Sequence, residues 1–187
     1  MTRALPFLFV FFAIILFSGC GKPEKLPVLP TKLSSEIVSE SFQVKYLFSE
    51  QARLKAKLET GRVQEKKEGQ KETSTGVHYF DRGVKLTFFD ETGQQETVLT
   101  SQTGKMNKEE GLADLQGKVV AQSKDGSKLE TEQLFWDEKK DKIYTAGYVH
   151  IQTATRILEG DGFESNTAMT RYRILKARGQ LQVENIE

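Results

Sequence analysis

Apolar and polar residues alternate with a period of two over most of the chain after residue 41. The first such run is FQVKYLF at residues 42–48, and another, VKLTF, covers residues 84–88. A strand with one buried face produces this period, so the pattern predicts an all-β domain. Shorter runs of the same kind lie at residues 97–99, 119–121, 129–131, 134–136, 143–145, 149–151, 157–159, 172–174 and 181–183.

Turn-forming residues separate these runs at intervals of roughly 8–12 residues. Short strands at this spacing are typical of an all-β sandwich, roll or barrel. Four segments have the composition of turns, namely DETG at residues 90–93, KDG at 124–126, EKKD at 138–141 and GDG at 160–162.

Two segments follow the strand pattern less clearly. Residues 50–59 (EQARLKAKLE) are rich in helix formers. Because Leu54, Ala56 and Leu58 alternate with lysines in the layout that recurs later, we predict a strand there. Residues 62–76 have no apolar pattern and are predicted to form a charged, mobile loop.

The first 19 residues have the pattern of an export signal. Arg3 precedes an apolar run at residues 5–17, which as a helix would measure about 20 Å, short of the hydrocarbon core of a bilayer. The small residues SG then precede Cys20. This arrangement resembles the signal of bacterial lipoproteins, so residues 1–19 are predicted to be removed and Cys20 to carry lipid. The alternative is an uncleaved anchor helix.

A tether is predicted between the membrane and the domain. Residues 20–38 begin with the lipidated cysteine and contain three of the four prolines, which favours an extended segment. The domain itself is expected at residues 39–187. Loss of the signal removes Arg3 and leaves 26 basic and 26 acidic residues, so the mature chain is formally neutral.

The composition argues against several classes of function. With 27 Lys+Arg and 26 Asp+Glu, the chain lacks the basic excess of a nucleic-acid-binding protein. One cysteine excludes an intramolecular disulfide and a multi-cysteine metal site. His78 and His150 are isolated and have no metal-ligand spacing. We therefore expect no catalytic residue, no metal site and no cofactor, and a hydrolase with unrecognised residues is the weakest alternative.

An ordered series of short motifs resembles the LptC family of periplasmic lipopolysaccharide-export proteins. The series spans about residues 40–185, nearly the whole expected domain. Members in enteric bacteria are anchored by an N-terminal helix, and the lipoprotein-like signal of this chain departs from that pattern. The motifs are GVKLTFFD at residues 83–90, Gly93, LTS at 99–101, LQGKV at 115–119, DGSKLETEQLFWD at 125–137, KIYT at 142–145, VHI at 149–151 and LEGDGFES at 158–165.

The resemblance implies a twisted, open β-jellyroll of two facing antiparallel sheets with an apolar interior groove. It implies lipopolysaccharide as the ligand, an inner-membrane LptB/F/G-type ABC transporter as its source and an LptA-type periplasmic bridge protein as its recipient. It implies no enzymatic activity. The expected location is the periplasmic face of the envelope, anchored by lipid, with the inner membrane favoured over the outer.

Strand alternation selects candidates for the groove. A dry β-sandwich core would show the same alternation, so the sequence leaves open whether these residues line a groove or fill a core. The candidates are Val84, Leu86 and Phe88, with Leu134, Trp136, Val149 and Ile151 expected to face them.

The last strands are candidates for contact with a partner. An unpaired strand edge can bind another chain by main-chain pairing, and Ile174, Leu181 and Val183 lie in the terminal runs. The alternative function from another class is a structural or adhesive surface lipoprotein with a β-sandwich binding domain.

Overall fold

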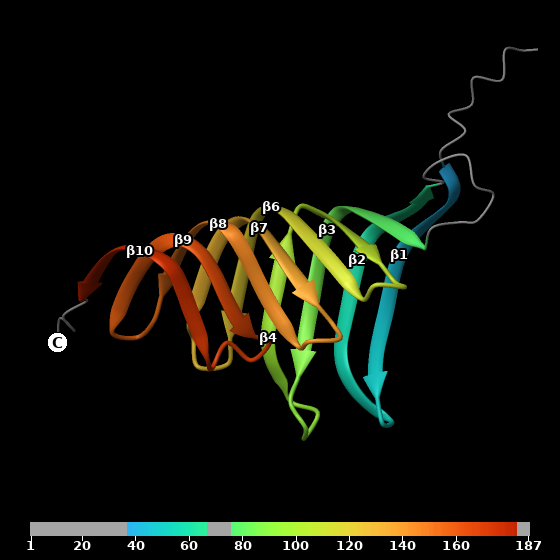
Figure 1. Cartoon of the computed structure of the whole chain (residues 1–187). Coiled ribbons are helices and arrows are strands. Elements are labelled where there is room, and N and C mark those ends of the chain that lie inside the picture. Colours follow the sequence, from blue (N-terminus) through green and yellow to red (C-terminus); the bar gives the residue numbers. More distant parts are fainter. Residues whose placement is uncertain (1–36, 67–75, 183–187) are drawn as a thin grey trace, which may run out of the picture. The chain divides into compact units, whose positions relative to one another are not determined.

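The computed structural model describes residues 37–66 and 76–182, which form ten antiparallel strands and confirm the all-β prediction (Figure 1). One continuous sheet has the order β1-β2-β3-β4-β6-β7-β8-β9-β10, and β5 pairs with β3 and β6. The strands are β1 (Ile37–Glu50), β2 (Arg53–Lys66), β3 (Val77–Phe89), β4 (Gln95–Ser101), β5 (Thr103–Asn107), β6 (Leu112–Ser123), β7 (Lys128–Asp137), β8 (Lys142–Gln152), β9 (Arg156–Asn166) and β10 (Tyr172–Gln182).

The predicted strand within residues 50–59, whose composition also suits a helix, is part of β2. Ala56 and Leu58 are completely buried on one face, whereas Lys55 lies on the other. The strand pairs with β1 on one side and β3 on the other. Burial of the apolar face and these backbone hydrogen bonds outweigh the helix propensity of the segment.

The strands are irregular where they cross one line, which we call the fold line. The ladder between β6 and β7 shifts register there, as do those between β2 and β3 and between β8 and β9. Gly117 has a φ of 79° at this position, a conformation that glycine adopts without strain. The fold line consists of Gln43, Gly61, residues 82–83, Gln102, residues 117–118, residues 132–133, residues 146–147 and Gly162.

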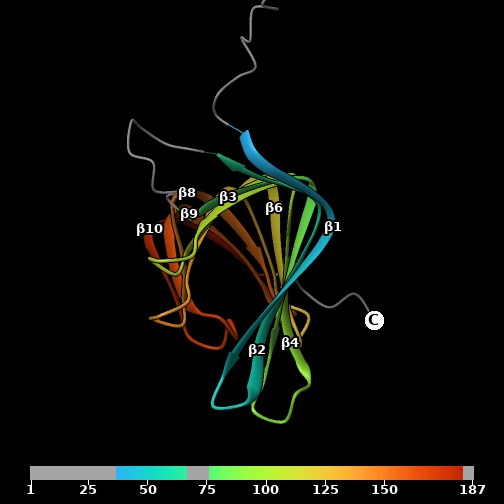
Figure 2. The ribbon, with the colours of Figure 1, turned by 90° about the vertical axis from the view of Figure 1, so that its right-hand side faces the viewer.

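The sheet doubles over at the fold line, because aligned bulges and bends allow strands to turn a corner (Figure 2). Phe48 of β1 and Phe88 of β3 both contact Trp136 of β7, across the interior rather than along the sheet. The two predicted facing sheets are therefore two halves of a single sheet. Layer A contains residues 44–60, 84–101, 119–131, 148–161 and 176–182, and layer B contains residues 37–42, 62–66, 77–81, 103–116, 134–145 and 163–174.

Buried hydroxyl groups satisfy backbone groups along the fold line. Each bulge leaves a carbonyl or amide outside the regular ladder, and an unpaired buried polar group is costly. Four Thr or Ser residues, each at most 8% exposed, occupy these positions in the strands. The bonds run from Thr60 Oγ1 to Asp81 O (3.1 Å), from Ser101 Oγ to Thr103 O (2.8 Å), from Thr131 Oγ1 to Tyr148 O (2.8 Å) and from Gly147 N to Thr145 Oγ1 (3.0 Å).

The structure corrects two local predictions. Residues 62–66, predicted to be a loop, continue β2, and Val63 among them is buried. A single core-facing residue among charged neighbours is too little to show a period. Residues 160–162 (GDG), predicted to be a turn, lie inside β9. Gly162 has a φ of 77° at the fold line, and a Cβ on Gly160 would collide with the backbone of β10.

Candidate functional site

The seven residues predicted to line a groove all belong to one buried hydrophobic cluster between the two layers. Each is at most 3% exposed, as their alternation predicted. Their arrangement differs from the prediction in one respect. Val149 and Ile151 lie in layer A, the same layer as the β3 candidates, rather than facing them, because the fold line crosses β8 between Thr145 and Tyr148. Only Leu134 and Trp136 face Val84, Leu86 and Phe88 from layer B.

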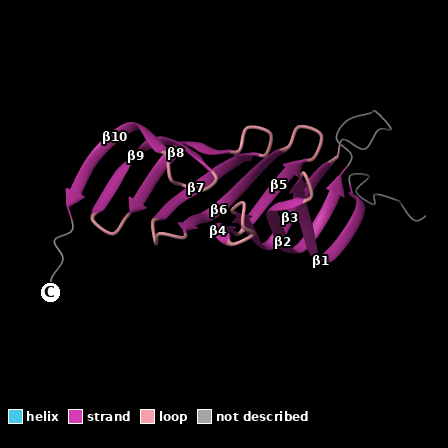
Figure 3. Ribbon diagram, turned by 90° about the horizontal axis from the view of Figure 1, so that it is seen from below, coloured by secondary structure: helices cyan, strands magenta, loops and turns pink. Residues whose placement is uncertain are grey.

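A cleft opens on the side away from the fold line, and we call it the mouth. The turns between strands gather along the two long margins of the sheet (Figure 3), and the mouth lies where these margins approach each other. Its volume of ≈ 750 Å³ falls within the range of ligand-binding clefts. Phe48, Ala56, Phe88 and Trp136 form its apolar floor, and the rim is made of turn residues together with residues at the ends of the adjoining strands. The mouth is therefore the point at which the buried cluster meets solvent.

Trp136 joins the two layers at the floor of the mouth. Its ring centroid lies 5.0 Å from that of Phe48, with an angle of 88° between the planes. The ring of Phe88 lies 5.3 Å away at 72°. Edge-to-face contacts of this kind stabilise a packed aromatic group beyond its burial. The three rings thus connect the two layers where the cleft reaches the buried cluster.

The rim carries charges of both signs. Its lining residues include six acidic and four basic side chains. Burial, and then the nearby Asp90 and Asp141, raise the pKa of Glu96, and burial raises the pKa of Glu138. The hydrogen bond with Glu50 raises the pKa of Lys55. The rim suits a polar group that stays in water, but it is not a cationic site for phosphate.

A second contact joins the two layers at the β1 edge of the sheet. The hydroxyl of Tyr46, in layer A, lies 3.0 Å from Nδ1 of His78, in layer B. Lys108 Nζ, from the turn between β5 and β6, lies 4.7 Å from the centroid of the Tyr46 ring. Sequence reasoning treated His78 as an isolated residue, since no local motif links two residues that are 32 positions apart.

The two ends of the sheet present exposed apolar side chains. Phe42 and Leu47 on β1, and Tyr172 and Leu175 on β10, are between 38% and 64% exposed. β10 is the terminal strand, as expected of a partner edge, and its Ile174 packs partly against the core. Among the other edge candidates, Leu181 pairs through its backbone with Ile157, and Val183 lies outside the described residues.

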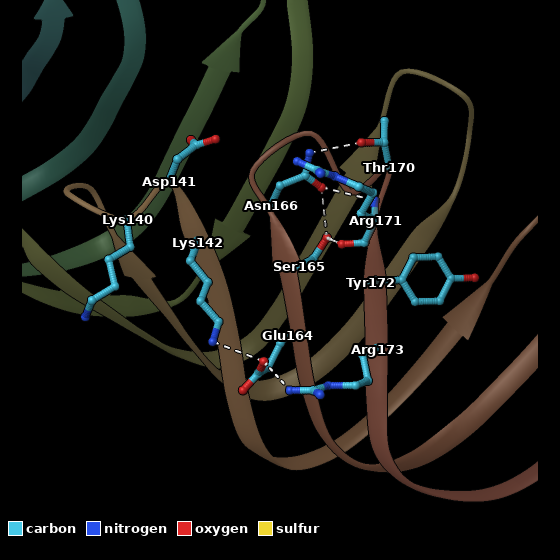
Figure 4. Close-up of a pocket in the computed structure, with 10 residues that line it drawn as sticks. All are labelled: Lys140, Asp141, Lys142, Glu164, Ser165, Asn166, Thr170, Arg171, Tyr172 and Arg173. Atoms are coloured by element: carbon cyan, nitrogen blue, oxygen red, sulfur yellow. Dashed lines mark hydrogen bonds and ion pairs between the residues drawn. The ribbon is translucent and has the colours of Figure 1, made fainter.

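A shallow hollow lies on the outside of layer B next to β10 (Figure 4). Glu164 of β9 accepts from Lys142 Nζ of β8 at 3.1 Å and from Arg173 of β10 at 2.9 Å. Both cations lower the pKa of Glu164. This three-strand ion ladder ties β10 to the sheet, and it is separated from the apolar interior. The hollow is lined by Lys140, Asp141, Lys142, Glu164, Ser165, Asn166, Thr170, Arg171, Tyr172 and Arg173.

The predicted signal, Cys20 and most of the tether lie outside the described residues. β1 begins at Ile37, two residues before the expected start of the domain. In residues 37–66 and 76–182, no helix has the length and hydropathy that crossing a membrane requires. The same residues contain no cluster of His, Cys, Asp or Glu side chains able to hold a metal ion.

The similarity of this chain to known proteins identifies its family. Residues 8–182 match the family model described as lipopolysaccharide-assembly, LptC-related. No curated protein sequence is similar enough to this chain to count as a match. A similar solved structure is that of LptH, described as the LptA homologous periplasmic component of the lipopolysaccharide transport device from Pseudomonas aeruginosa. It has a TM-score of 0.48 and 13% identity, and the match covers 66% of this chain and 84% of that chain.

Proposed function

This chain belongs to the LptC-related family of lipopolysaccharide-assembly proteins, and from that premise we propose that it carries lipopolysaccharide by holding the acyl chains between its two layers. The observation that carries the proposal is the mouth. A buried apolar cluster, which includes all seven candidate residues, reaches solvent there through an aromatic floor and a polar rim. An amphiphile needs this arrangement. Apolar surface left in water costs about 25 cal/mol per Å², so the acyl chains have to be buried, and the sugars have to stay in water.

The proposal extends to transfer. An inner-membrane LptB/F/G-type ABC transporter supplies lipopolysaccharide, and an LptA-type bridge protein receives it. The exposed apolar residues on β10 support its use as the edge that pairs with the bridge protein. The chain itself performs no chemistry in this proposal, and the energy comes from the transporter.

The acyl-chain site is tested by photocrosslinking in cells that make the full chain. A benzophenone amino acid replaces Phe48 at the floor of the mouth, or Phe135 as the matched control. Phe135 follows the inward-facing Leu134 on β7, and its ring stacks on Tyr144 outside the interior, at 5.2 Å. We expect lipopolysaccharide adducts from position 48 and few from position 135. Equal yields from both positions, or none from position 48, would reject the interior as the site.

The anchor is a separate part of the proposal. Cys20, after the apolar run and the residues SG, is proposed to carry lipid that holds the domain at the periplasmic face of the inner membrane. Cys20→Ser should abolish acylation and leave an unprocessed or soluble form. If the Cys20→Ser protein still fractionates with membranes at its mature size, the apolar segment acts as the anchor and lipidation is rejected.

A further inference from the structure

We propose that Tyr46, His78 and Lys108 form a latch that holds the two layers together at the β1 edge of the sheet, beside the mouth, and that acyl chains displace it on their way into the interior. This inference rests on the proposed function, since it concerns access to the same site. It assigns a role to the polar groups of three residues, of which Tyr46 also packs its ring against the hydrophobic cluster.

The three groups come from both layers, and Lys108 also lines the mouth. Tyr46 lies on β1 in layer A, His78 on β3 in layer B, and Lys108 in the turn after β5. The Tyr46 hydroxyl lies 3.0 Å from His78 Nδ1, and the Lys108 ammonium lies over the Tyr46 ring. The Tyr46 ring also meets the His78 ring edge to face, with centroids 5.7 Å apart. β1 is thus tied across the interior to strands with which it is not paired in the sheet.

The position of the latch makes it removable. β1 is the edge strand, with β2 as its only neighbour in the described sheet, so its movement leaves the other ladders intact. Tyr46 and Phe48 are only partly buried, unlike the completely buried Leu58 and Leu86 of the next two strands. The fold line opposite the mouth contains breaks in the ladders at which the layers are able to move apart. In this proposal the fold line acts as a hinge, and the contact of Tyr46 with His78 holds the two layers together on the other side.

The surroundings of His78 and Tyr46 favour the neutral forms of both side chains. Burial, and then the positive charge of Lys108, lower the pKa of His78, while Glu65 on β2 opposes them. Burial and Glu65 raise the pKa of Tyr46. A hydrogen bond between a neutral imidazole and a neutral phenol is of ordinary strength, and a ligand is able to replace it with apolar contacts.

The test uses the only tryptophan of the chain, Trp136, as the reporter. Purified full-length protein in a fixed concentration of mild detergent is mixed with lipopolysaccharide, and the change in Trp136 emission is followed with time. Tyr46→Phe removes the hydroxyl and keeps the ring, and His78→Leu removes the imidazole that is bonded to this hydroxyl. Tyr79→Phe is the matched control, because Tyr79 lies next to His78 on the opposite face of β3, beneath Lys66 Nζ. Melting temperatures establish that each variant is folded.

We expect Tyr46→Phe to accelerate the emission change about fivefold, the population shift that loss of one ordinary hydrogen bond produces. His78→Leu should accelerate it similarly, and the double variant should be no faster than either single one. If wild type responds to lipopolysaccharide but Tyr46→Phe responds at the rate of wild type and Tyr79→Phe, the latch is rejected and the site stands. If wild type gives no response and no adduct forms at position 48, the proposed function itself fails. Should His78→Leu not fold, Tyr46→Phe alone decides.

Discussion

Arg62 and Asp81 form a two-point ion pair between β2 and β3, immediately beside the fold line. Arg62 Nε donates to Asp81 Oδ1 at 2.7 Å, and a second guanidinium nitrogen bonds the other carboxylate oxygen. The Asp81 carbonyl accepts from Thr60 on the neighbouring strand, so side chain and backbone of Asp81 both tie β3 to β2. The corner of the sheet is thus held by an ion pair outside and hydroxyl bonds inside.

This pair predicts a dependence of stability on pH. The hydrogen bonds from Arg62 lower the pKa of Asp81 below its ordinary value. A carboxyl whose folded pKa is depressed stabilises the fold above its unfolded pKa of about 3.9, and this contribution is lost as the pH falls through the folded value. We expect the melting temperature of wild type to fall more steeply below pH 4 than that of Asp81→Asn. Parallel pH profiles for the two proteins would contradict this role of Asp81.

Depth in the interior should determine which apolar positions tolerate a larger side chain. Val149 is completely buried beside the fold line and pairs with Thr131 and Gly160. Val149→Trp should therefore lower the free energy of unfolding by about 1–3 kcal/mol, the usual cost of overpacking. Phe48, partly buried at the mouth, should accept Trp with a change below about 1 kcal/mol. Urea unfolding measures both values.

An unchanged stability of Val149→Trp would have a definite meaning. It would show that the interior near Val149 opens to accept volume, and so that acyl chains reach the fold line. Lipopolysaccharide crosslinking from position 48 in the Val149→Trp background then shows whether the added indole blocks them.

Two threonines allow a matched test of buried hydroxyl groups. Thr97 is completely buried, and its hydroxyl has no hydrogen-bond partner among the residues that the structure describes. Thr131 is also buried, but its hydroxyl donates to Tyr148 O at 2.8 Å. Replacing an unpaired hydroxyl with a methyl group removes a desolvation cost, so Thr97→Val should raise the free energy of unfolding by up to about 1 kcal/mol. Thr131→Val should lower it by about 1 kcal/mol, because the Tyr148 carbonyl then loses its partly buried hydrogen bond.

Chemical denaturation of the two valine variants distinguishes these expectations. If Thr97→Val is destabilised as much as Thr131→Val, the Thr97 hydroxyl has a structural partner, and its apparent isolation is wrong.

The two ends of the sheet provide a test of the partner edge. Leu175 on β10 is 50% exposed and Leu47 on β1 is 64% exposed, so a charge at either position should leave the fold intact. If β10 pairs with the bridge protein, Leu175→Asp should weaken binding of an LptA-type protein about tenfold, equivalent to about 1.4 kcal/mol. Leu47→Asp should leave that affinity unchanged. Binding lost in Leu47→Asp and retained in Leu175→Asp would assign the contact to β1.

The alternation of apolar and polar side chains determined where most strands lie and which face of each strand is buried. Residues 84–88 and 134–136 have a period of two because a strand exposes alternate residues to opposite faces, and each run is part of a strand with its apolar residues inside. The turns at residues 90–93, 124–126 and 138–141 follow from residue types that suit turns. The burial of all seven groove candidates was predictable for the same reason.

The tertiary structure decided which of these residues face one another. Val149 and Trp136 have the same alternation, yet the fold line places them in opposite layers, and a bulge leaves only a weak trace in the pattern of one strand. The fold line arises from irregularities aligned across many strands, and alignment is a property of pairing between distant segments. The contact of Tyr46 with His78 depends on that corner, because only the doubling of the sheet brings β1 over β3. Sequence determined the faces of the strands, and three-dimensional packing determined which of those faces meet in the interior.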